Sequence, residues 1–169
     1  KNYIRKNKDL VYITLDLSWS RFQNYYNDWH GNWKTDGGVL AQQGIHYVDL
    51  LIYLFGQPLK CISSISNKVN KLQAEDTHSS LIIFKKNEVS CNVNMSTAFR
   101  PVDYEASINI YCKDKIITLR GLCCNEVSVH KLKNKKRSSI IKKFSQKVPS
   151  GYGVSHKKVF QKVINKELK

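Results

Sequence analysis

The feature that most constrains the fold is an amphipathic segment that begins near residue 35 and ends near residue 58. Thr35 or Asp36 can cap a helix, because their side-chain oxygens accept hydrogen bonds from the first free backbone N–H groups. Gly56, followed by Pro58, is a typical helix stop. The segment between these signals predicts one helix of about twenty residues.

The two faces of this predicted helix differ in chemistry. Apolar or small residues recur at the spacing that places side chains on one side of a helix: Leu40, Gly44, Val48, Leu51 and Phe55. The opposite side carries an amide, an imidazole, a carboxylate and a phenol: Gln42, His46, Asp49 and Tyr53. We expect the first set to be buried and the second to line a solvent-accessible pocket, with His46 as the candidate acid/base. A single histidine on a helix is also common at surfaces and in cores, so the pattern alone leaves both interpretations open.

Short runs of β-branched and aromatic residues flank the predicted helix. The run at residues 10–19 predicts a strand before it. Further strands are predicted at residues 60–69, 77–84, 88–95, 104–111, 115–119 and 126–132. Polar turns at residues 85–87 and 113–114 predict antiparallel neighbours. The predicted fold class is therefore α+β, with an open, mostly antiparallel sheet of about six strands and helices on one face.

Size and composition predict one domain over residues 1–169, with a basic loop at 131–150 and a C-terminal helix at 152–168. No apolar run approaches the roughly 18 residues of a membrane span, and no apolar stretch follows the charged N-terminus, so we expect a cytoplasmic protein without membrane contact. The five cysteines form no C-x-x-C pair, which favours reduced thiols and gives no metal site.

The formal charge of +15 is concentrated near the C-terminus, where residues 131–169 hold 13 Lys or Arg and one acid, a net +12. Only five of the 28 basic residues in the chain are Arg, the side chain that base and phosphate recognition favours. We therefore expect a solvated or anion-attracting surface and no specific nucleic-acid binding.

Three ordered motifs surround the predicted helix: Trp29-x-Gly31-x-Trp33, Asp36-Gly37-Gly38-x-Leu40 and Gly44-Ile45-His46-x-x-Asp49-Leu50-Leu51. They resemble the C-terminal domain of the Gfo/Idh/MocA oxidoreductase family, and most closely its branch that oxidises UDP-N-acetylglucosaminuronate at the sugar 3-hydroxyl. The resemblance implies NAD as cofactor, bound by a Rossmann domain that precedes this one. No G-x-G-x-x-G occurs in the sequence, so we expect the Rossmann domain to be absent and no cofactor to bind this chain.

The resemblance also implies site residues. His46 matches the catalytic histidine that, with a lysine of the Rossmann domain, handles the proton of the substrate hydroxyl. Gln42 stands where relatives carry Asp or Asn, and because an amide is no base, it would orient the sugar, or else catalysis has been lost. Aromatic faces beside amides suit a sugar or uracil ring, although they could equally pack over the sheet. The expected substrate-binding residues are Gln42, Trp29, Trp33, Tyr26, Asp36, Asp49, Arg100 and His156.

Two hypotheses about function follow. In the first, the chain is the substrate-binding and oligomerisation domain of an NAD-dependent sugar-nucleotide dehydrogenase of lipopolysaccharide or O-antigen synthesis, forming a homodimer or homotetramer through the open sheet face. The alternative is a non-enzymatic, self-associating or anion-binding domain that lacks the nucleotide-binding half. In either case we expect no dehydrogenase turnover from the 169 residues alone.

Overall fold

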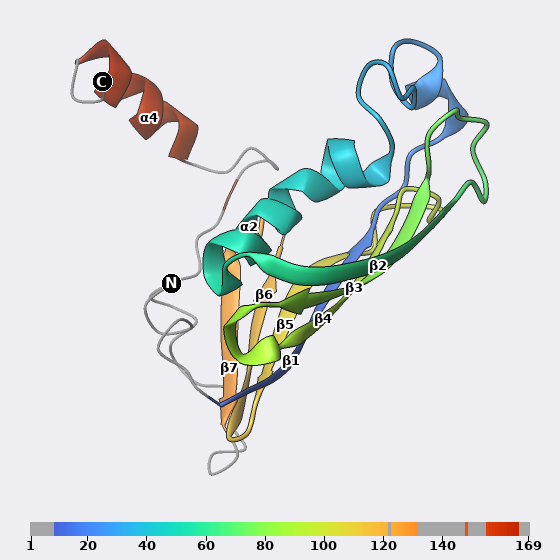
Figure 1. Ribbon diagram of the computed structural model, residues 1–169. Coiled ribbons are helices and arrows are strands. Elements are labelled where there is room, and N and C mark those ends of the chain that lie inside the picture. Colours follow the sequence, from blue (N-terminus) through green and yellow to red (C-terminus); the bar gives the residue numbers. More distant parts are fainter. Residues whose placement is uncertain (1–8, 122, 132–147, 149–154, 166–169) are drawn as a thin grey trace.

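The computed structural model describes residues 9–121, 123–131, 148 and 155–165, and its centre is one open sheet (Figure 1). The seven strands lie in the order β2-β3-β4-β1-β5-β6-β7, and every neighbouring pair is antiparallel except β1 and β4. Their bounds are β1 Leu10–Ser18, β2 Pro58–Ser66, β3 Thr77–Phe84, β4 Ser90–Ser96, β5 Glu105–Cys112, β6 Lys115–Arg120 and β7 Glu126–Lys131. The predicted α+β class is confirmed, with seven strands in place of about six.

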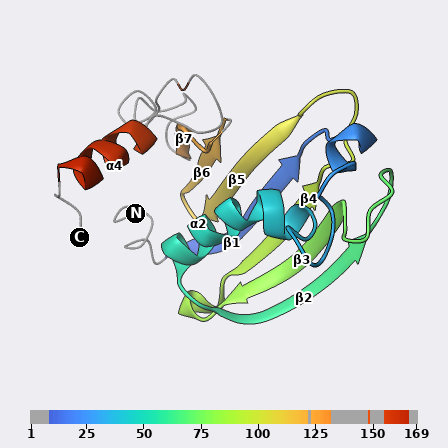
Figure 2. The ribbon, with the colours of Figure 1, turned by 90° about the horizontal axis from the view of Figure 1, so that it is seen from above.

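The predicted central helix is present but is not one uniform α-helix. A π-helical turn, η2 (Leu40–Gly44), leads into α2 (Ile45–Phe55), and the two lie across one face of the sheet (Figure 2). The predicted stop is confirmed, because Gly56 has a φ of 91° and its N–H donates to the carbonyl of Ile52 at 2.8 Å.

The predicted helix start at Thr35 or Asp36 is wrong. The Thr35 hydroxyl donates to the carbonyls of Trp29 (2.5 Å) and Asn32 (3.1 Å), so it closes the turn before the helix. The first N–H groups of the helix are instead bound by Glu75, a residue distant in sequence. Its carbonyl accepts from Val39 (2.9 Å) and its Oε1 accepts from Leu40 (3.1 Å).

The core lies between this helix and the covered face of the sheet. Leu51 and Phe55 of α2 are buried over strand residues such as Leu15 and Phe84, and the rings of Phe55 and Phe84 are 5.6 Å apart. Each such side chain contributes roughly 1.5–3 kcal/mol by leaving water. The predicted burial of the two faces is confirmed, whereas the pocket expected along the polar face stays a prediction. The apolar set is buried or half-buried, Gln42 is half-buried, and the other members of the polar set are exposed: His46, Asp49 and Tyr53.

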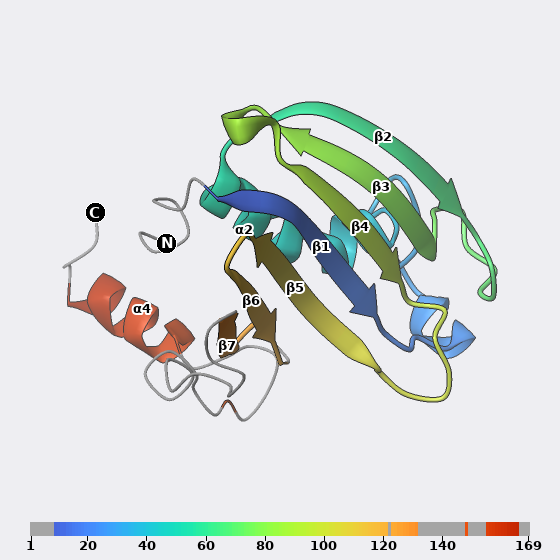
Figure 3. The ribbon, with the colours of Figure 1, turned by 90° about the horizontal axis from the view of Figure 1, so that it is seen from below.

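The opposite face of the sheet carries a polar row together with exposed apolar side chains such as Ile62, Leu81 and Ile116, and none of the described helices covers it (Figure 3). Neighbouring strands place Thr14, Asn109 and Thr118 in one row across this face. The Asn109 amide donates to the Thr14 hydroxyl (3.2 Å), and the Thr118 hydroxyl donates to Asn109 Oδ1 (2.9 Å).

Three further helical segments complete the described fold: η1 (Gln23–Tyr26), η3 (Lys86–Glu88) and α4 (Ser155–Ile164). The helix α4 lies inside the range 152–168 for which a C-terminal helix is predicted. The basic loop predicted at 131–150 lies outside the described residues, apart from its first residue and residue 148. None of the described helices has the length and apolarity needed to cross a membrane.

The loop between β2 and β3 is built around the buried carboxylate of Asp76, which is 0% exposed. Its oxygens accept from the backbone N–H groups of Lys68 (2.8 Å), Val69 (3.0 Å) and Asn70 (3.0 Å), and from the Thr77 hydroxyl (2.9 Å). Burial raises the pKa of Asp76, but these hydrogen bonds outweigh it and hold the pKa below its usual range. Asp76 therefore holds the whole loop from residue 68 to residue 77 in place.

Replacing Asp76 with Asn should destabilise the protein by about 2 kcal/mol or more at neutral pH, because an amide meets the N–H donors with only one acceptor oxygen. A lowered folded pKa stabilises the fold above the unfolded pKa of about 3.9, and that stabilisation is lost as the pH falls through the folded pKa. Urea unfolding at several pH values should thus show that the difference in free energy of unfolding between wild type and Asp76→Asn becomes smaller in acid. Asp49→Asn, which changes an exposed aspartate, is the control and should have the same free energy of unfolding as wild type. A difference between wild type and Asp76→Asn that stays constant with pH would contradict the role of Asp76.

Candidate functional site

His46 is exposed on the first turn of α2, and Gln42 lies just before it in the π-helical turn. On an α-helix adjacent residues point apart, yet here the Gln43 amide donates to Gln42 Oε1. Gln43 itself is buried. The helix therefore carries a paired amide one turn before the imidazole, and Gln43 is a candidate site residue that the predicted α-helical spacing did not reveal.

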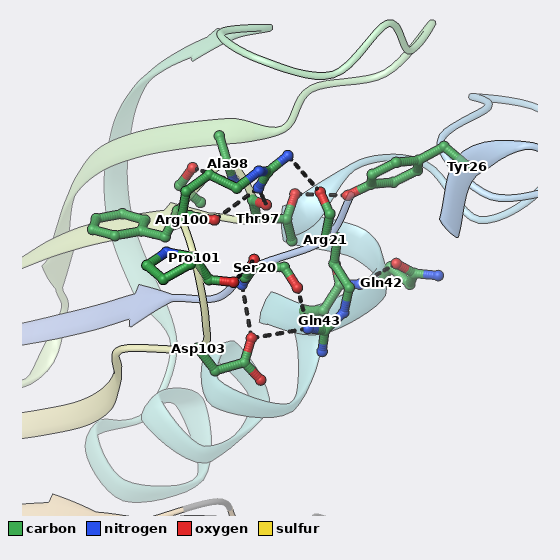
Figure 4. Close-up of polar contacts among 12 residues, drawn as sticks. Ser20, Arg21, Tyr26, Gln42, Gln43, Thr97, Ala98, Arg100, Pro101 and Asp103 are labelled. Carbon is green, nitrogen blue, oxygen red and sulfur yellow. Dashed lines mark hydrogen bonds and ion pairs between the residues drawn. The ribbon is translucent and has the colours of Figure 1, made fainter. Parts of the chain in front are cut away.

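Two tyrosines from η1 meet this paired amide and the end of β4. The Tyr26 hydroxyl donates to Thr97 Oγ1 at 2.7 Å (Figure 4), and the Tyr25 and Tyr26 rings pack edge to face at 5.1 Å. Burial raises the pKa of Tyr25, while the Arg21 charge and hydrogen bonds with Gln42 and Gln43 work in the opposite direction. Tyr25 thus joins residues 21–33, called here the aromatic segment, to the amide pair. Of the two adjacent tyrosines, the sequence suggested only Tyr26 as a site residue.

The predicted tryptophans lie at the outer end of the aromatic segment, and both are exposed, Trp29 at 56% and Trp33 at 57%. Trp29 stacks on His30 with ring centroids 3.9 Å apart, and His30 in turn packs on Tyr25 at 4.3 Å. His30 Nδ1 contacts Asp28 Oδ1 at 2.5 Å, which fixes the imidazole between the two rings. A continuous set of rings therefore runs from the amide pair to an exposed indole.

Two arginines hold the loop that follows β4 against this segment (Figure 4). Arg100 donates to the carbonyls of Phe99 (2.7 Å), Thr97 (3.3 Å) and Arg21 (3.0 Å), and to Asn70 Oδ1 (3.1 Å). Its guanidinium, expected to meet a substrate carboxylate, is thus already bound to the protein. Arg21 pairs with Asp103 at 3.0 Å, and its guanidinium lies over the Tyr25 ring at 5.6 Å from the centroid.

An open pocket of about 560 Å3 lies where β5, β6 and β7 meet the end of β1. Its lining includes Trp19, Tyr104, Arg120 and three carboxylates, those of Asp103, Glu105 and Glu126, and none of the predicted site residues. The Trp19 ring contacts the Tyr47 ring of α2 edge-on at 6.3 Å.

His46 projects from the side of α2 opposite to Phe55, which packs on β3. The imidazole therefore points away from the buried side of α2, and it does not line the pocket.

The remaining predicted residues are dispersed. Asp49 is exposed one turn after His46, and Asp36 is half-buried before the helix, with Oδ2 buried and without a hydrogen-bond partner. His156 belongs to α4, but its side chain lies outside the described residues. Within the described part of the chain, no cluster of three or more His, Cys, Asp or Glu side chains could hold a metal ion.

Comparison with models of protein families matches residues 1–169 to the family described as "Oxidoreductase family, C-terminal alpha/beta domain". A search of curated proteins found no match. Among solved structures, the chain is similar to the WlbA dehydrogenase of Bordetella pertussis in complex with NADH and UDP-GlcNAcA. That likeness has 26% identity and a TM-score of 0.69, and covers 75% of this chain and 36% of the other.

Two further structures share the fold. The WlbA dehydrogenase of Chromobacterium violaceum, with the same two ligands, is 22% identical with a TM-score of 0.77, covering 98% of this chain and 48% of that one. A levoglucosan dehydrogenase in complex with NADH is 16% identical with a TM-score of 0.69, covering 82% and 41%. The chain thus spans less than half the length of each. Because the family model matches its whole length, the chain belongs to the Gfo/Idh/MocA oxidoreductase family as a C-terminal α/β domain.

Proposed function

We propose that this chain is the substrate-binding domain of an NAD-dependent dehydrogenase that oxidises a UDP-N-acetylhexosaminuronate at its 3-hydroxyl, in lipopolysaccharide or O-antigen synthesis. The observation that carries the proposal is the exposed His46, one turn after Gln42 on the helix of a domain whose solved neighbours include two WlbA dehydrogenases with bound NADH and UDP-GlcNAcA. In this proposal His46 is the catalytic residue.

Oxidation of a secondary alcohol requires a base for the O–H proton and an acceptor for the hydride. An imidazole suits the first task, because it gains and loses a proton near neutral pH. The second task belongs to a nicotinamide, but the sequence has no Gly-rich dinucleotide turn, so the residues of this chain do not fit that cofactor. The proposal therefore places NAD on a separate Rossmann module.

The amide pair gives Gln42 a defined role in this proposal. Its Oε1 already accepts from the Gln43 amide, so in this proposal Gln42 would donate to a ligand through its NH2 group. Such a donor suits a sugar hydroxyl or carboxylate oxygen, and it would hold the 3-hydroxyl near His46. The exposed rings of Trp29 and Trp33 would stack on the uracil or sugar ring.

We also propose self-association through the open sheet face, as a dimer or tetramer. The support is that this face is uncovered by the described helices and exposes apolar side chains such as Ile62 and Leu81. The basic residues at 131–169 favour the second candidate, an anion-binding domain without turnover. Loss of activity on substitution of one histidine separates the two candidates.

In an enzyme that pairs this domain with its nucleotide-binding module, His46→Ala should lower kcat for UDP-GlcNAcA oxidation by about 10²- to 10⁴-fold, the usual effect of losing a general base. NADH absorbance reports the rate, and UDP-GlcNAcA binding should change little. His130→Ala, which removes an exposed histidine of β7, is the matched control and should leave kcat unchanged. Equal rates for His46→Ala and wild type would refute the catalytic role, and the 169-residue chain alone should show no turnover.

The stacking role predicts a change in ligand affinity. Trp29→Ala and Trp33→Ala should each weaken UDP-GlcNAcA binding by about tenfold, because stacking on a base ring contributes roughly 1–3 kcal/mol. Calorimetry measures the affinity directly. Phe99→Ala, which removes an exposed ring stacked on Tyr104 at 6.4 Å, serves as the control. Unchanged affinity in both tryptophan variants would show that the indoles only pack within their own segment.

A further inference from the structure

We infer that Glu75 is a positioning residue, which sets the orientation of Gln42 and His46 from a point 35 residues beyond the helix start. The roles of those two residues rest on the function proposed above. The inference itself concerns how the protein holds them, so it can be tested without a substrate.

The first observation is that one distant residue binds the opening N–H groups of the helix. Glu75 is 4% exposed, its carbonyl accepts from Val39 at 2.9 Å, and its Oε1 accepts from Leu40 at 3.1 Å. Val39, at the N-cap position, provides no side-chain hydrogen bond. Because the first N–H groups of any helix lack partners within it, Glu75 fixes where this helix can begin.

The second observation is that Gly38 makes this contact possible. A Cβ atom at Gly38 would overlap both the carboxylate and the carbonyl oxygen of Glu75. At the other end of the π-helical turn, a Cβ atom at Gly44 would overlap Met95 Sδ of β4. The turn is therefore fixed at its start by Glu75 and at its end by close packing on the sheet.

The third observation is the shape of the turn itself. A π-helical turn holds more residues than an α-helical one, so it changes the angle between residues before and after it. Gln42 lies inside η2 and His46 lies just after it. If the contact with Glu75 were lost, the turn could relax toward α-helical geometry, and the Gln42 amide would rotate relative to the imidazole.

The test compares Glu75→Ala and Glu75→Gln by NMR of the ligand-free 169-residue chain. In Glu75→Ala, the amide proton of Leu40 should exchange at least tenfold faster, while core amides such as those of Leu15 and Val93 keep their protection. The ring signal of His46 and the side-chain amide signal of Gln42 should both move. Glu75→Gln keeps an acceptor oxygen, so its Leu40 exchange rate and its His46 and Gln42 signals should stay close to those of wild type.

Glu88→Ala is the matched control, because it removes an exposed glutamate in the turn between β3 and β4. If Glu75→Ala does not fold, Gly38→Ala provides the second variant, since its Cβ displaces both the carboxylate and the carbonyl oxygen of Glu75 and should shift the same His46 and Gln42 signals. Faster Leu40 exchange with unmoved His46 and Gln42 signals would overturn the inference, because Glu75 would then be only a helix cap. If the enzyme that includes this domain did not oxidise UDP-GlcNAcA, the proposed function would be refuted, but the outcome of this NMR test would not change.

Discussion

Two adjacent buried carboxylates, Glu75 and Asp76, are the interaction on which the site region depends. Burying a carboxylate is costly unless hydrogen bonds replace its water. Glu75 Oε1 and both oxygens of Asp76 accept from backbone N–H groups of separate segments, while Glu75 Oε2 is buried without a partner among the described residues. Glu75 binds the start of the central helix, and Asp76 binds three consecutive N–H groups of the loop after β2. The carbonyl of Asp76 also accepts from the N–H of Thr97, whose hydroxyl accepts from Tyr26. The helix, the aromatic segment and the end of β4 are thus held together at one point.

The two sides of the central helix have different roles in this account. The side that carries Leu51 and Phe55 is buried on the sheet, while His46 on the other side is exposed and joined to no core contact. The imidazole can therefore meet a ligand without loss of packing, and the amide pair with its tyrosine supplies directional groups next to it. The acidic pocket beside Trp19 is a poor site for the proposed substrate. Its three carboxylates would repel the negative charges of a nucleotide-sugar uronate.

Much of the fold could be predicted because it depends on local periodicity. The strand at residues 77–84 and the buried face of the central helix follow from alternation and helical spacing, and Gly56 ends the helix as its backbone freedom suggests. The helix start could not be predicted, since its cap comes from Glu75, and no local pattern reveals so distant a contact. The π-helical turn, and with it the pairing of Gln43 with Gln42, was hidden because helical spacing assumes α geometry. Arg100 was assigned to a ligand because sequence alone cannot show the carbonyls that surround it.

The central claim is that a nucleotide sugar binds beside His46, and ligand titration followed by NMR of histidine ring signals tests it most directly. On addition of UDP-GlcNAcA, the account predicts that the signal of His46 shifts together with the side-chain amide signal of Gln42, while that of exposed His130 on β7 does not move. Saturable binding that leaves His46 unmoved, with shifts confined to the pocket around Trp19 and Glu126, would contradict it.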